Sequence, residues 1–286
     1  MRPFPRERAS IIVVGLGYGD EAKGATVDFL ASRIPDTVAV VRWSGGVNAA
    51  HNVMHGSRHH TFRQFGSATL LDVPTRMLAP MQVDPLGLSV EAEELRSIGV
   101  TDPYGLLTVD ARCLVTTPFH AAMNRAREED RGAERHGSCG VGIGETIGYA
   151  LATQGIHCNL AYPDTRGRVL RAQHLRSVQE LTLRLDDLAY AAERLGATRL
   201  PEVTATASAM HEVGQLLRLT DDADGDLART MEAGTVLFEG SQGALLDEHA
   251  GFHPHTTFAT TIPSVSTSRQ REDSIQAVGL PRLGIR

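Results

Sequence analysis

The stretch that most constrains the fold is residues 10–33, which read SIIVVGLGYGDEAKGATVDFLASR. The continuous, β-branched run at Ser10–Val14 is typical of a buried parallel strand, and a glycine-rich turn follows it. Ala22–Arg33 then has the spacing of a helix that packs on the sheet. The side chains expected to point inward from this helix are Val27, Phe29, Leu30 and Ile34. A strand, a glycine turn and a helix in this order predict an α/β unit.

The rest of the chain continues the alternation of strands and helices. We expect strands at 37–41 and 235–240, and helices at 89–97, 118–131, 175–195 and 227–233. This order indicates an α/β fold with a central, mainly parallel sheet flanked by helices. No linker stands out, so we expect a single domain over residues 1–286 with helical insertions around 85–230.

Composition excludes some classes of function. The net charge of −6 argues against a protein that binds nucleic acid through a basic face. The apolar run near the N-terminus is far too short to span a membrane. The three cysteines, Cys113, Cys139 and Cys158, form no Cys-x-x-Cys pair and are odd in number, which favours a reduced, cytoplasmic setting.

The glycine turn at residues 15–24 predicts an anion site. Free backbone N–H groups and the dipole of the following helix would point at a bound anion, and Lys23 adds a mobile positive charge suited to phosphate. The turn matches neither the usual phosphate-loop pattern nor the dinucleotide-binding pattern. The alternative is an ordinary tight turn in which Asp20 caps the helix. The density of Asp, Glu and Lys in the turn favours function.

Two further corners follow predicted strands. The first, RWSGGVNAAHN, brings Asn48 and His51. Histidine is the side chain most easily used as an acid near neutral pH, although a histidine after a turn is often structural. The second, VLFEGSQGALLD, brings Glu239 and Gln242. Such corners gather at the carboxyl ends of strands in an open α/β sheet, where ligands bind.

Together the three corners resemble the adenylosuccinate synthetase family. GDEAKG, GGVNAAH and VLFEGSQGALLD are similar, in order, to the family motifs W-G-D-E-G-K-G-K, G-G-x-N-A-G-H-T and F-E-G-A-Q-G-x-x-L-D. The resemblance covers roughly the N-terminal two-thirds of a typical member. It implies a P-loop-NTPase-like adenylosuccinate synthetase fold that is incomplete at its C-terminal end.

The resemblance also implies a function. The family uses GTP and Mg²⁺ to join L-aspartate to inosine monophosphate in purine biosynthesis, and it works as a homodimer. Asp20 then corresponds to the base that takes the N1 proton of the purine and to a ligand of Mg²⁺. His51 corresponds to the acid that steadies the β-phosphate oxygen, and Ala50 to the residue whose backbone carbonyl binds the metal. The implied nucleotide-binding positions are Gly19, Asp20, Glu21, Lys23, Gly24, Asn48, Ala49, Ala50, His51, Cys139, Gln242 and Thr257.

The sequence departs from the family at several of its functional positions. The nucleotide loop G-T-T-x-R-G-I-G-P here reads GSCGVGIGE, so Ser138 and Cys139 replace two threonines. Val141 and Glu145 replace the arginine and the proline of the same loop. The arginine that a second subunit usually lends aligns near Thr153. Finally, Ala22 stands at a glycine position of the phosphate turn, where a Cβ would crowd a bound phosphate.

The chain reads LPRLGIR at its end, where the family continues into an aspartate-binding loop and a T-K-x-D guanine-recognition strand. Neither string is present in the sequence. Two alternatives to the ligase therefore stay open. One is a non-catalytic nucleotide-binding homologue, and the other is a phosphotransferase or NTPase that does not use aspartate.

A group of histidines, His51, His55, His59 and His60, lies close together in the sequence. A zinc site would need defined ligand spacing and supporting carboxylates. We interpret His55, His59 and His60 instead as solvent-facing loop residues.

Overall fold

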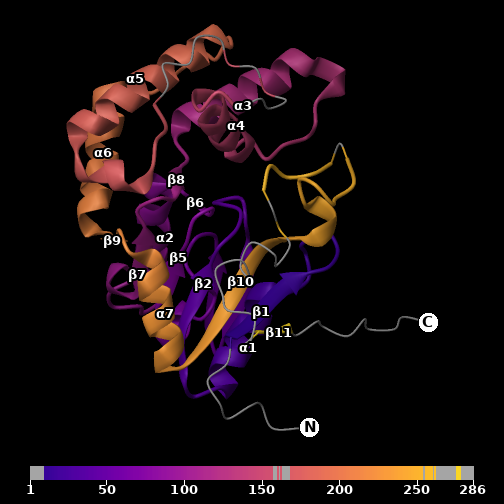
Figure 1. Ribbon diagram of the computed structural model, residues 1–286, viewed down its shortest axis with the longest axis vertical. Coiled ribbons are helices and arrows are strands. Elements are labelled where there is room, and N and C mark those ends of the chain that lie inside the picture. Colours follow the sequence, from indigo (N-terminus) through magenta and orange to yellow (C-terminus); the bar gives the residue numbers. More distant parts are fainter. Residues whose placement is uncertain are drawn as a thin grey trace.

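The computed structural model describes residues 10–156, 160, 162, 168–253, 255–259 and 261, together with the backbone of a strand at 275–277. Its centre is a parallel sheet with the strand order β11-β1-β10-β2-β5-β7-β9. The strands are β1 (Ser10–Gly15), β2 (Thr37–Arg42), β5 (Thr75–Met77), β7 (Leu107–Asp110), β9 (Arg218–Thr220), β10 (Thr235–Gly243) and β11 (Ile275–Ala277). The predicted mainly parallel sheet is confirmed (Figure 1).

Strand β10 lies between β1 and β2 although more than 190 residues separate it from either strand in sequence. Each of its nine residues is buried, as expected for a strand that has neighbours on both edges and layers on both faces. Its register places Glu239 opposite Val13 of β1 and Arg42 of β2. The ends of the three strands, and the three glycine-rich corners that follow them, therefore meet.

Helices cover both faces of this part of the sheet. Helix α1 (Lys23–Arg33) packs Val27 and Leu30 on one face with Ile11, and α7 (Ala223–Ala233) packs Leu227 on the other with Ile12. Neighbouring residues of β1 thus point to opposite layers, as the pleat requires.

One predicted core residue is not in the core. Phe29 of α1 is 42% exposed, and the Arg33 guanidinium lies over its ring. The helix buries one stripe at Val27, Leu30 and Ile34, and Phe29 falls outside that stripe.

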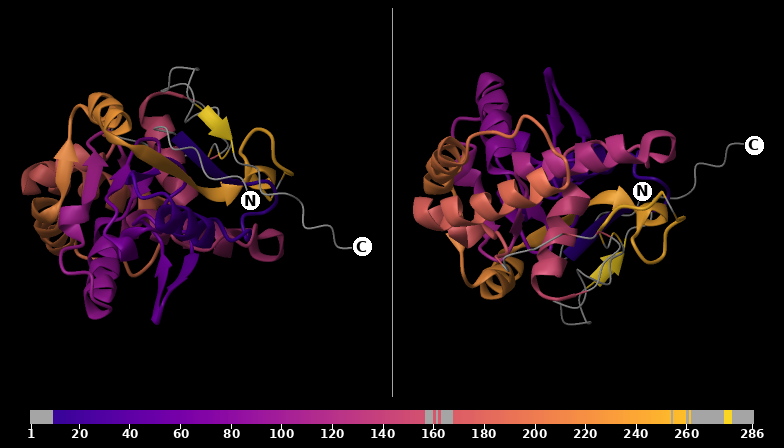
Figure 2. Two further views of the ribbon diagram at one scale, coloured as in Figure 1. Left: turned by 90° about the horizontal axis from the view of Figure 1, so that it is seen from below. Right: turned by 90° about the horizontal axis from the view of Figure 1, so that it is seen from above.

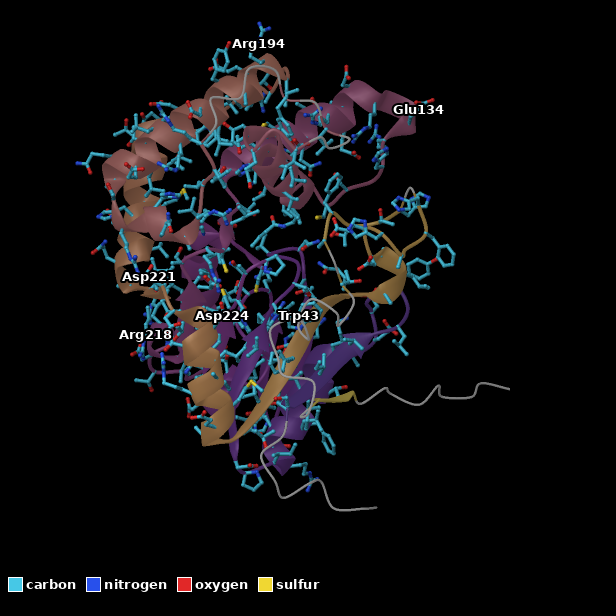
Figure 3. The ribbon with its side chains drawn as sticks, viewed as in Figure 1. Trp43, Glu134, Arg194, Arg218, Asp221 and Asp224 are labelled. Carbon is cyan, nitrogen blue, oxygen red and sulfur yellow. The ribbon has the colours of Figure 1, made fainter. Side chains whose placement is uncertain are left out.

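The remaining helices form a second layer around the largest apolar cluster of the described chain. They are α2 (Pro85–Ser97), α3 (Pro118–Arg131), α4 (Ile143–Thr153), α5 (Val178–Arg194) and α6 (Val203–Leu216). In Figure 1, α3, α4 and α5 lie above the sheet, and α5 packs against both α3 and α6. Figure 3 shows Trp43 in the interior, whereas Glu134 and Arg194 project from the rim of this layer.

The bounds of α3 agree with those predicted, for a clear local reason. Thr117 and His120 form a capping box at its start, Pro118 occupies the first turn, and Gly132 at φ 54° ends it. The helices predicted at 89–97, 175–195 and 227–233 are also present with shifted ends. Helices α4 and α6 had not been predicted.

The histidine-rich segment is a hairpin and not a loop, so that expectation was wrong. Strands β3 (His51–His55) and β4 (Arg58–Phe62) pair antiparallel and project as a narrow ribbon in Figure 2. His60 is buried, with its Nε2 3.7 Å from an oxygen of Glu91, whereas His59 is exposed. Alternation along the strand separates the two side chains.

Short elements complete the described chain. Strands β6 (Gln82–Val83) and β8 (Leu114–Val115) form a small parallel pair, and the 3₁₀ turns are η1 (Thr69–Leu71), η2 (Tyr104–Leu106), η3 (Gly132–Glu134), η4 (Ala172–Arg176) and η5 (Ala244–Leu246). No helix in the described ranges is both long enough and apolar enough to cross a membrane. Cys113 is buried and Cys139 is exposed, and Cys158 lies outside the described residues.

Candidate functional site

The three glycine-rich corners touch one another at positions where a side chain would not fit. A Cβ added to Gly19 (φ 105°) would lie 3.3 Å from the backbone nitrogen of Gly243. A Cβ added to Gly45 (φ 70°) would lie 2.5 Å from Nε2 of Gln242. Both glycines also have left-handed backbone angles, which other residues adopt at a cost. These glycines let the corners after β1, β2 and β10 form one continuous surface.

Within the first turn, Glu21 organises the backbone. Its carboxylate accepts hydrogen bonds from the N–H groups of Leu16 at 3.0 Å, Gly17 at 2.9 Å and Gly19 at 3.3 Å. Because three donors are already bound to it, Glu21 shapes the turn from within. This is a different role from the direct nucleotide contact predicted for it.

Lys23 is hydrogen-bonded to the backbone of the same turn. Its side chain is buried, and its Nζ donates a hydrogen bond to the carbonyl oxygen of Gly19 at 2.7 Å. Burial lowers the pKa of Lys23, and the nearby carboxylates of Glu21 and Glu239 partly offset that shift. The Lys23 ammonium group is therefore buried against the backbone of the turn that is predicted to bind a phosphate.

Asp20 lies at the exposed tip of the turn and does not cap the helix. The N-cap residue of α1 is Ala22, and no side chain makes a capping hydrogen bond there. The first N–H groups of α1 consequently have no side-chain cap, which is the arrangement that anions exploit at helix N-termini. The alternative in which Asp20 is a structural cap is wrong.

Ala22 has an unusual backbone conformation for a residue with a Cβ. Its φ of 57° and ψ of 31° are left-handed, a region that costs a non-glycine residue about 1–2 kcal/mol. Glycine has no such cost but loses ~0.5–1 kcal/mol more conformational entropy on folding. The position therefore favours glycine by a small margin.

We expect Ala22→Gly to raise the free energy of unfolding by up to about 1 kcal/mol, the difference between these two effects. Thermal unfolding monitored by circular dichroism would show it as a higher Tm. The matched control is Ala25→Gly, in an exposed position of the same helical turn. It should lower stability by about 1 kcal/mol, since glycine is a poor helix former. A lower Tm for Ala22→Gly would contradict the assigned strain.

The second corner brings His51 onto a buried carboxylate. Nδ1 of His51 lies 2.5 Å from Oε1 of Glu239, and the two side chains are 6% and 0% exposed. Ser67 adds its backbone N–H at 3.0 Å and a short hydroxyl hydrogen bond to the same carboxylate. Burial alone would raise the pKa of Glu239, but His51 and the nearby Arg42 lower it to about 2. The Glu239 carboxylate therefore fixes the orientation of the His51 ring by binding its Nδ1 edge.

The other ring nitrogen of His51 is different. Nε2 is buried and has no hydrogen-bond partner among the residues that the structure describes. Buried polar atoms are nearly always satisfied in proteins, so one that is not indicates a place for a missing partner. His51 is thus held by Glu239 through Nδ1, while its Nε2 is available to bind a ligand atom.

Close packing places this histidine beside the first turn of α1. A Cβ added to Gly24 would lie 2.7 Å from Cβ of His51 and 2.8 Å from Oγ of Ser67. Glycine at this position therefore allows the helix to contact the start of β3 directly. Lys23, Gly24 and His51 form one compact group at the ends of β1 and β10.

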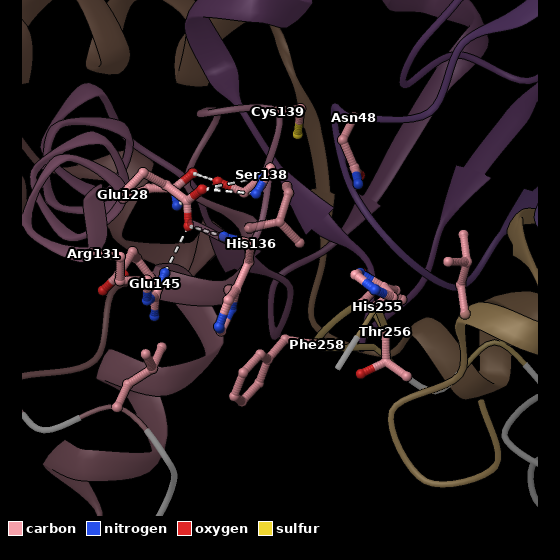
Figure 4. A pocket seen from close by; sticks show the side chains of 17 residues that line it. Asn48, Glu128, Arg131, His136, Ser138, Cys139, Glu145, His255, Thr256 and Phe258 are labelled. Atoms are coloured by element: carbon pink, nitrogen blue, oxygen red, sulfur yellow. Dashed lines mark hydrogen bonds and ion pairs between the residues drawn. The ribbon is translucent and has the colours of Figure 1, made fainter. Parts of the chain in front are cut away.

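A cavity of about 380 Å³ is lined in part by Asn48, which belongs to the same corner as His51 (Figure 4). Its wall includes Asn48, Cys139 and Thr257, three of the predicted nucleotide-binding residues, which come from three separate segments. Nε2 of Gln242 lies 3.4 Å from Oδ1 of Asn48 and links the cavity to the third corner. Ala49 is buried and Ala50 is exposed in the same segment.

The loop that carries Cys139 is fixed by Glu128 of α3. The carboxylate accepts backbone hydrogen bonds from His136 at 3.4 Å, Gly137 at 2.9 Å and Ser138 at 3.4 Å, and pairs with Arg131 at 2.6 Å (Figure 4). Burial would raise the pKa of Glu128, but these donors hold it below its usual value. The loop therefore has a defined position along the cavity.

Glu145, at the family's proline position, is buried and fully engaged. It pairs with Arg127 at 2.9 Å and accepts a hydrogen bond from the Tyr162 hydroxyl at 2.6 Å. The departure from the loop pattern is thus compensated by a neighbouring arginine.

For a metal ion, the described residues offer no group of three or more His, Cys, Asp or Glu side chains. They do offer hard oxygen ligands, the exposed Asp20 carboxylate in the first corner and the backbone carbonyl of the exposed Ala50 in the second. Mg²⁺ is usually bound by one or two protein oxygens together with substrate phosphates and water. The donor set fits an ion that arrives with a nucleotide.

Two residues of this site had not been assigned a role from the sequence. Glu239 is 188 positions away from His51, and Ser67 lies in a segment with no motif. The signal for Glu239 was available, because an acidic residue stood inside an otherwise apolar strand. An acid in a doubly covered strand requires a buried partner.

Comparisons with known proteins agree with the motifs. Residues 12–276 match the family model described as adenylosuccinate synthetase. The adenylosuccinate synthetase of Syntrophotalea carbinolica is 31% identical over 257 residues, which are 89% of this chain and 57% of that protein. The one from Acidithiobacillus ferrooxidans is 32% identical over 261 residues, or 88% of this chain and 56% of that protein. This chain thus spans little more than half the length of these relatives.

A solved structure is similar in fold. The fully ligated adenylosuccinate synthetase from Plasmodium falciparum superposes with a TM-score of 0.77 at 18% identity, over 94% of this chain and 60% of that chain. The likeness extends across both the sheet and the helical layer.

Proposed function

Because the chain belongs to the adenylosuccinate synthetase family, we propose that it uses GTP and Mg²⁺ to join L-aspartate to inosine monophosphate or a related purine nucleotide. The reaction would pass through a nucleotide phosphorylated on its C6 oxygen. One observation carries the proposal: a buried His51, fixed at Nδ1 and open at Nε2, packs against the first turn of α1, whose N-terminus has no side-chain cap. The corner that holds His51 also contributes Asn48 to a cavity that Thr257 lines.

In this mechanism Asp20 acts first. Its carboxylate accepts the N1 proton of the purine, and the electron pair that is released makes the C6 oxygen nucleophilic. That oxygen forms a bond to the γ-phosphorus of GTP, and the bond from the γ-phosphorus to the β-phosphate oxygen breaks. An exposed carboxylate at the tip of the phosphate turn is suited to this task, because it can reach both reactants.

His51 then acts at the leaving group. Its Nε2–H donates a hydrogen bond to the β-phosphate oxygen as negative charge develops there. Glu239 acts as a positioning residue, since its carboxylate lies 2.5 Å from Nδ1 and orients the ring. The aspartate amine finally displaces phosphate from C6, and the phosphate leaves with the former C6 oxygen.

The remaining proposed contacts follow from position. Gly19, Lys23 and Gly24 form the phosphate cradle, with Glu21 bracing it, while Asn48, Cys139, Gln242 and Thr257 contact the purine nucleotide. The Asp20 carboxylate and the Ala50 carbonyl would hold Mg²⁺. When bound, the ion would neutralise charge on the transferring phosphoryl group.

We also propose that the protein is a cytoplasmic homodimer. Edge strands of an open sheet expose unpaired backbone groups, and association is one way to cover them. We expect light scattering to give twice the monomer mass across micromolar concentrations. A monomer at all of these concentrations would contradict the dimer.

The function is tested by incubating the protein with GTP, inosine monophosphate and Mg²⁺, with and without aspartate. The ligase predicts adenylosuccinate, followed by absorbance and chromatography, with phosphate release that depends on aspartate. GTP cleavage without that dependence would indicate the phosphotransferase or NTPase. Nucleotide binding with no turnover, measured by calorimetry, would indicate a binding homologue.

A further inference from the structure

We infer that Arg42 is a positioning residue for His51, since its buried guanidinium fixes both the strand end and the chain segment that hold Glu239. The inference rests on the proposed function for the reaction that His51 serves. Arg42 acts through Glu239 and not on a reactant. It extends the pair His51–Glu239 to a group of three buried side chains.

Arg42, the last residue of β2, is 0% exposed. Arginine is almost never fully buried unless its charge and its N–H groups have partners. Its Nη1 donates a hydrogen bond to the carbonyl oxygen of Phe65 at 3.0 Å, and its Nη2 donates to that of Arg63 at 3.3 Å. One guanidinium therefore holds two carbonyl groups of the same short segment.

That segment, residues 63–67, lies between β4 and η1 and is also held through its N–H groups. Glu91 of α2 is 0% exposed, and its carboxylate accepts hydrogen bonds from the backbone N–H groups of the segment's first three residues at 2.9, 2.9 and 3.3 Å. The segment ends at Ser67, whose N–H and hydroxyl bind Glu239. The position of the segment therefore sets the position of the Glu239 carboxylate.

Arg42 also fixes the strand end that carries Glu239. Its Nη2 donates a hydrogen bond at 2.9 Å to Oγ of Ser241, which lies two residues beyond Glu239 on β10. The Ser241 hydroxyl in turn donates to the carbonyl oxygen of Ser44 at 2.5 Å, in the corner after β2. The guanidinium therefore joins segment 63–67 to the ends of β2 and β10, which are neighbours in the sheet (Figure 1).

The charge of Arg42 serves the same carboxylate. Burial would raise the pKa of Glu239, but His51 of β3 and Arg42 of β2 lower it to about 2. Lys23 of α1 also interacts with Glu239 through its charge. Arginine side chains stay protonated in proteins, and the hydrogen bonds of Arg42 described above go to other oxygen atoms. Arg42 therefore stabilises the charged carboxylate and leaves its oxygen atoms to His51 and Ser67.

The test replaces Arg42 by a cation that cannot make the same contacts. Arg42→Lys keeps the positive charge, but one ammonium group cannot span the acceptors on segment 63–67 and on β10. Ser241→Ala removes one of these acceptors and leaves Arg42 in place, so it decides the question if Arg42→Lys does not fold. The matched control is Arg76→Lys, on the neighbouring strand β5 and outside this group. Circular dichroism checks that each variant is folded.

The first readout is proton NMR of the protein without nucleotide. A proton in the short contact between Nδ1 of His51 and the Glu239 carboxylate resonates far downfield of ordinary imidazole N–H protons. We expect one such resonance in wild type and in Arg76→Lys, and its absence from His51→Asn assigns it. In Arg42→Lys it should be shifted or lost, and in Ser241→Ala it should be shifted by less. An unchanged resonance in folded Arg42→Lys, or in Ser241→Ala where it alone folds, would overturn the inference.

The second readout is the single-turnover rate with GTP, inosine monophosphate, Mg²⁺ and aspartate. We expect Arg42→Lys to lower this rate about tenfold or more with unchanged half-saturating concentrations of both nucleotides, because a displaced ring is felt in the transition state. In the His51→Asn background the same change should cost nothing further, since the group that it positions is absent. An equal loss in both backgrounds would make Arg42 a structural residue and would also overturn the inference.

The two readouts separate this inference from the proposed function. If the resonance depends on Arg42 but the wild type forms no adenylosuccinate, the positioning of His51 stands and the function fails. If adenylosuccinate forms and neither readout depends on Arg42, the function stands and the inference fails.

Discussion

Asp20→Asn is expected to reduce turnover by at least ~10²-fold while leaving the fold intact, because general bases typically contribute that much or more. Asparagine keeps the shape of the side chain but cannot accept the purine proton, and it is a weaker ligand for Mg²⁺. The stability should change little, because Asp20 is exposed and does not cap α1. The measurement is the steady-state rate of adenylosuccinate formation together with a thermal unfolding curve.

The matched control for this variant is Asp186→Asn, which makes the same change at an exposed position of α5. It should retain the wild-type rate. Activity of Asp20→Asn above about a tenth of wild type would rule out a general-base role, given the usual size of that contribution.

The second large effect is expected at His51, where the two ring nitrogens can be tested separately. Asparagine can place an amide N–H near the position of Nδ1 and keep the contact with Glu239, but it has no group at the position of Nε2. We expect His51→Asn to slow single turnover by roughly 10²-fold or more, the usual loss for one transition-state donor, with a small change in Tm. Nucleotide affinity should change little, since the interaction strengthens as charge develops.

Glu239→Gln completes this experiment. A positioning role predicts a smaller rate loss than for His51→Asn, and no additional loss when the two changes are combined, because both act through one ring. If His51→Asn lowered the Tm while the single-turnover rate stayed unchanged, His51 would be structural. If the rate losses of the two single variants added up in the double variant, Glu239 would act independently of His51, which would contradict its positioning role.

The elements that the sequence predicted well are those with local signals. Strands β1, β2 and β10 are apolar runs that end in charged or glycine-rich corners, and α3 is marked by Thr117–Pro118 at its start and Gly132 at its end. Their motifs were sufficient to place Asp20 and His51 at neighbouring strand ends.

The elements that were missed lack such signals. Helix α4 begins in a run of glycines, which reads as a loop, and its conformation depends on packing against α3. The β3–β4 hairpin is rich in His, Asn and Arg, and only its pairing shows that His60 is buried. The contact between His51 and Glu239 joins residues 188 positions apart, so the local pattern indicates that Glu239 needs a buried partner but does not identify it.

The pairing of charges along the cavity wall also could not be predicted from a local sequence pattern. The pair Glu128–Arg131 joins two residues of α3, and the pair Glu145–Arg127 joins α4 to α3. Their effect is visible once α3, α4 and the loop at 136–139 are in place.

The most direct test of the 6-phosphoryl route is an isotope transfer. Inosine monophosphate labelled with ¹⁸O at C6 is incubated with the protein, GTP, Mg²⁺ and aspartate, and the released phosphate is examined by ³¹P NMR. If the C6 oxygen attacks the γ-phosphorus and later departs with it, each phosphate released during turnover carries the ¹⁸O label. Unlabelled phosphate would mean that water attacks GTP, and would contradict the assignment of Asp20 as the base that activates the purine oxygen.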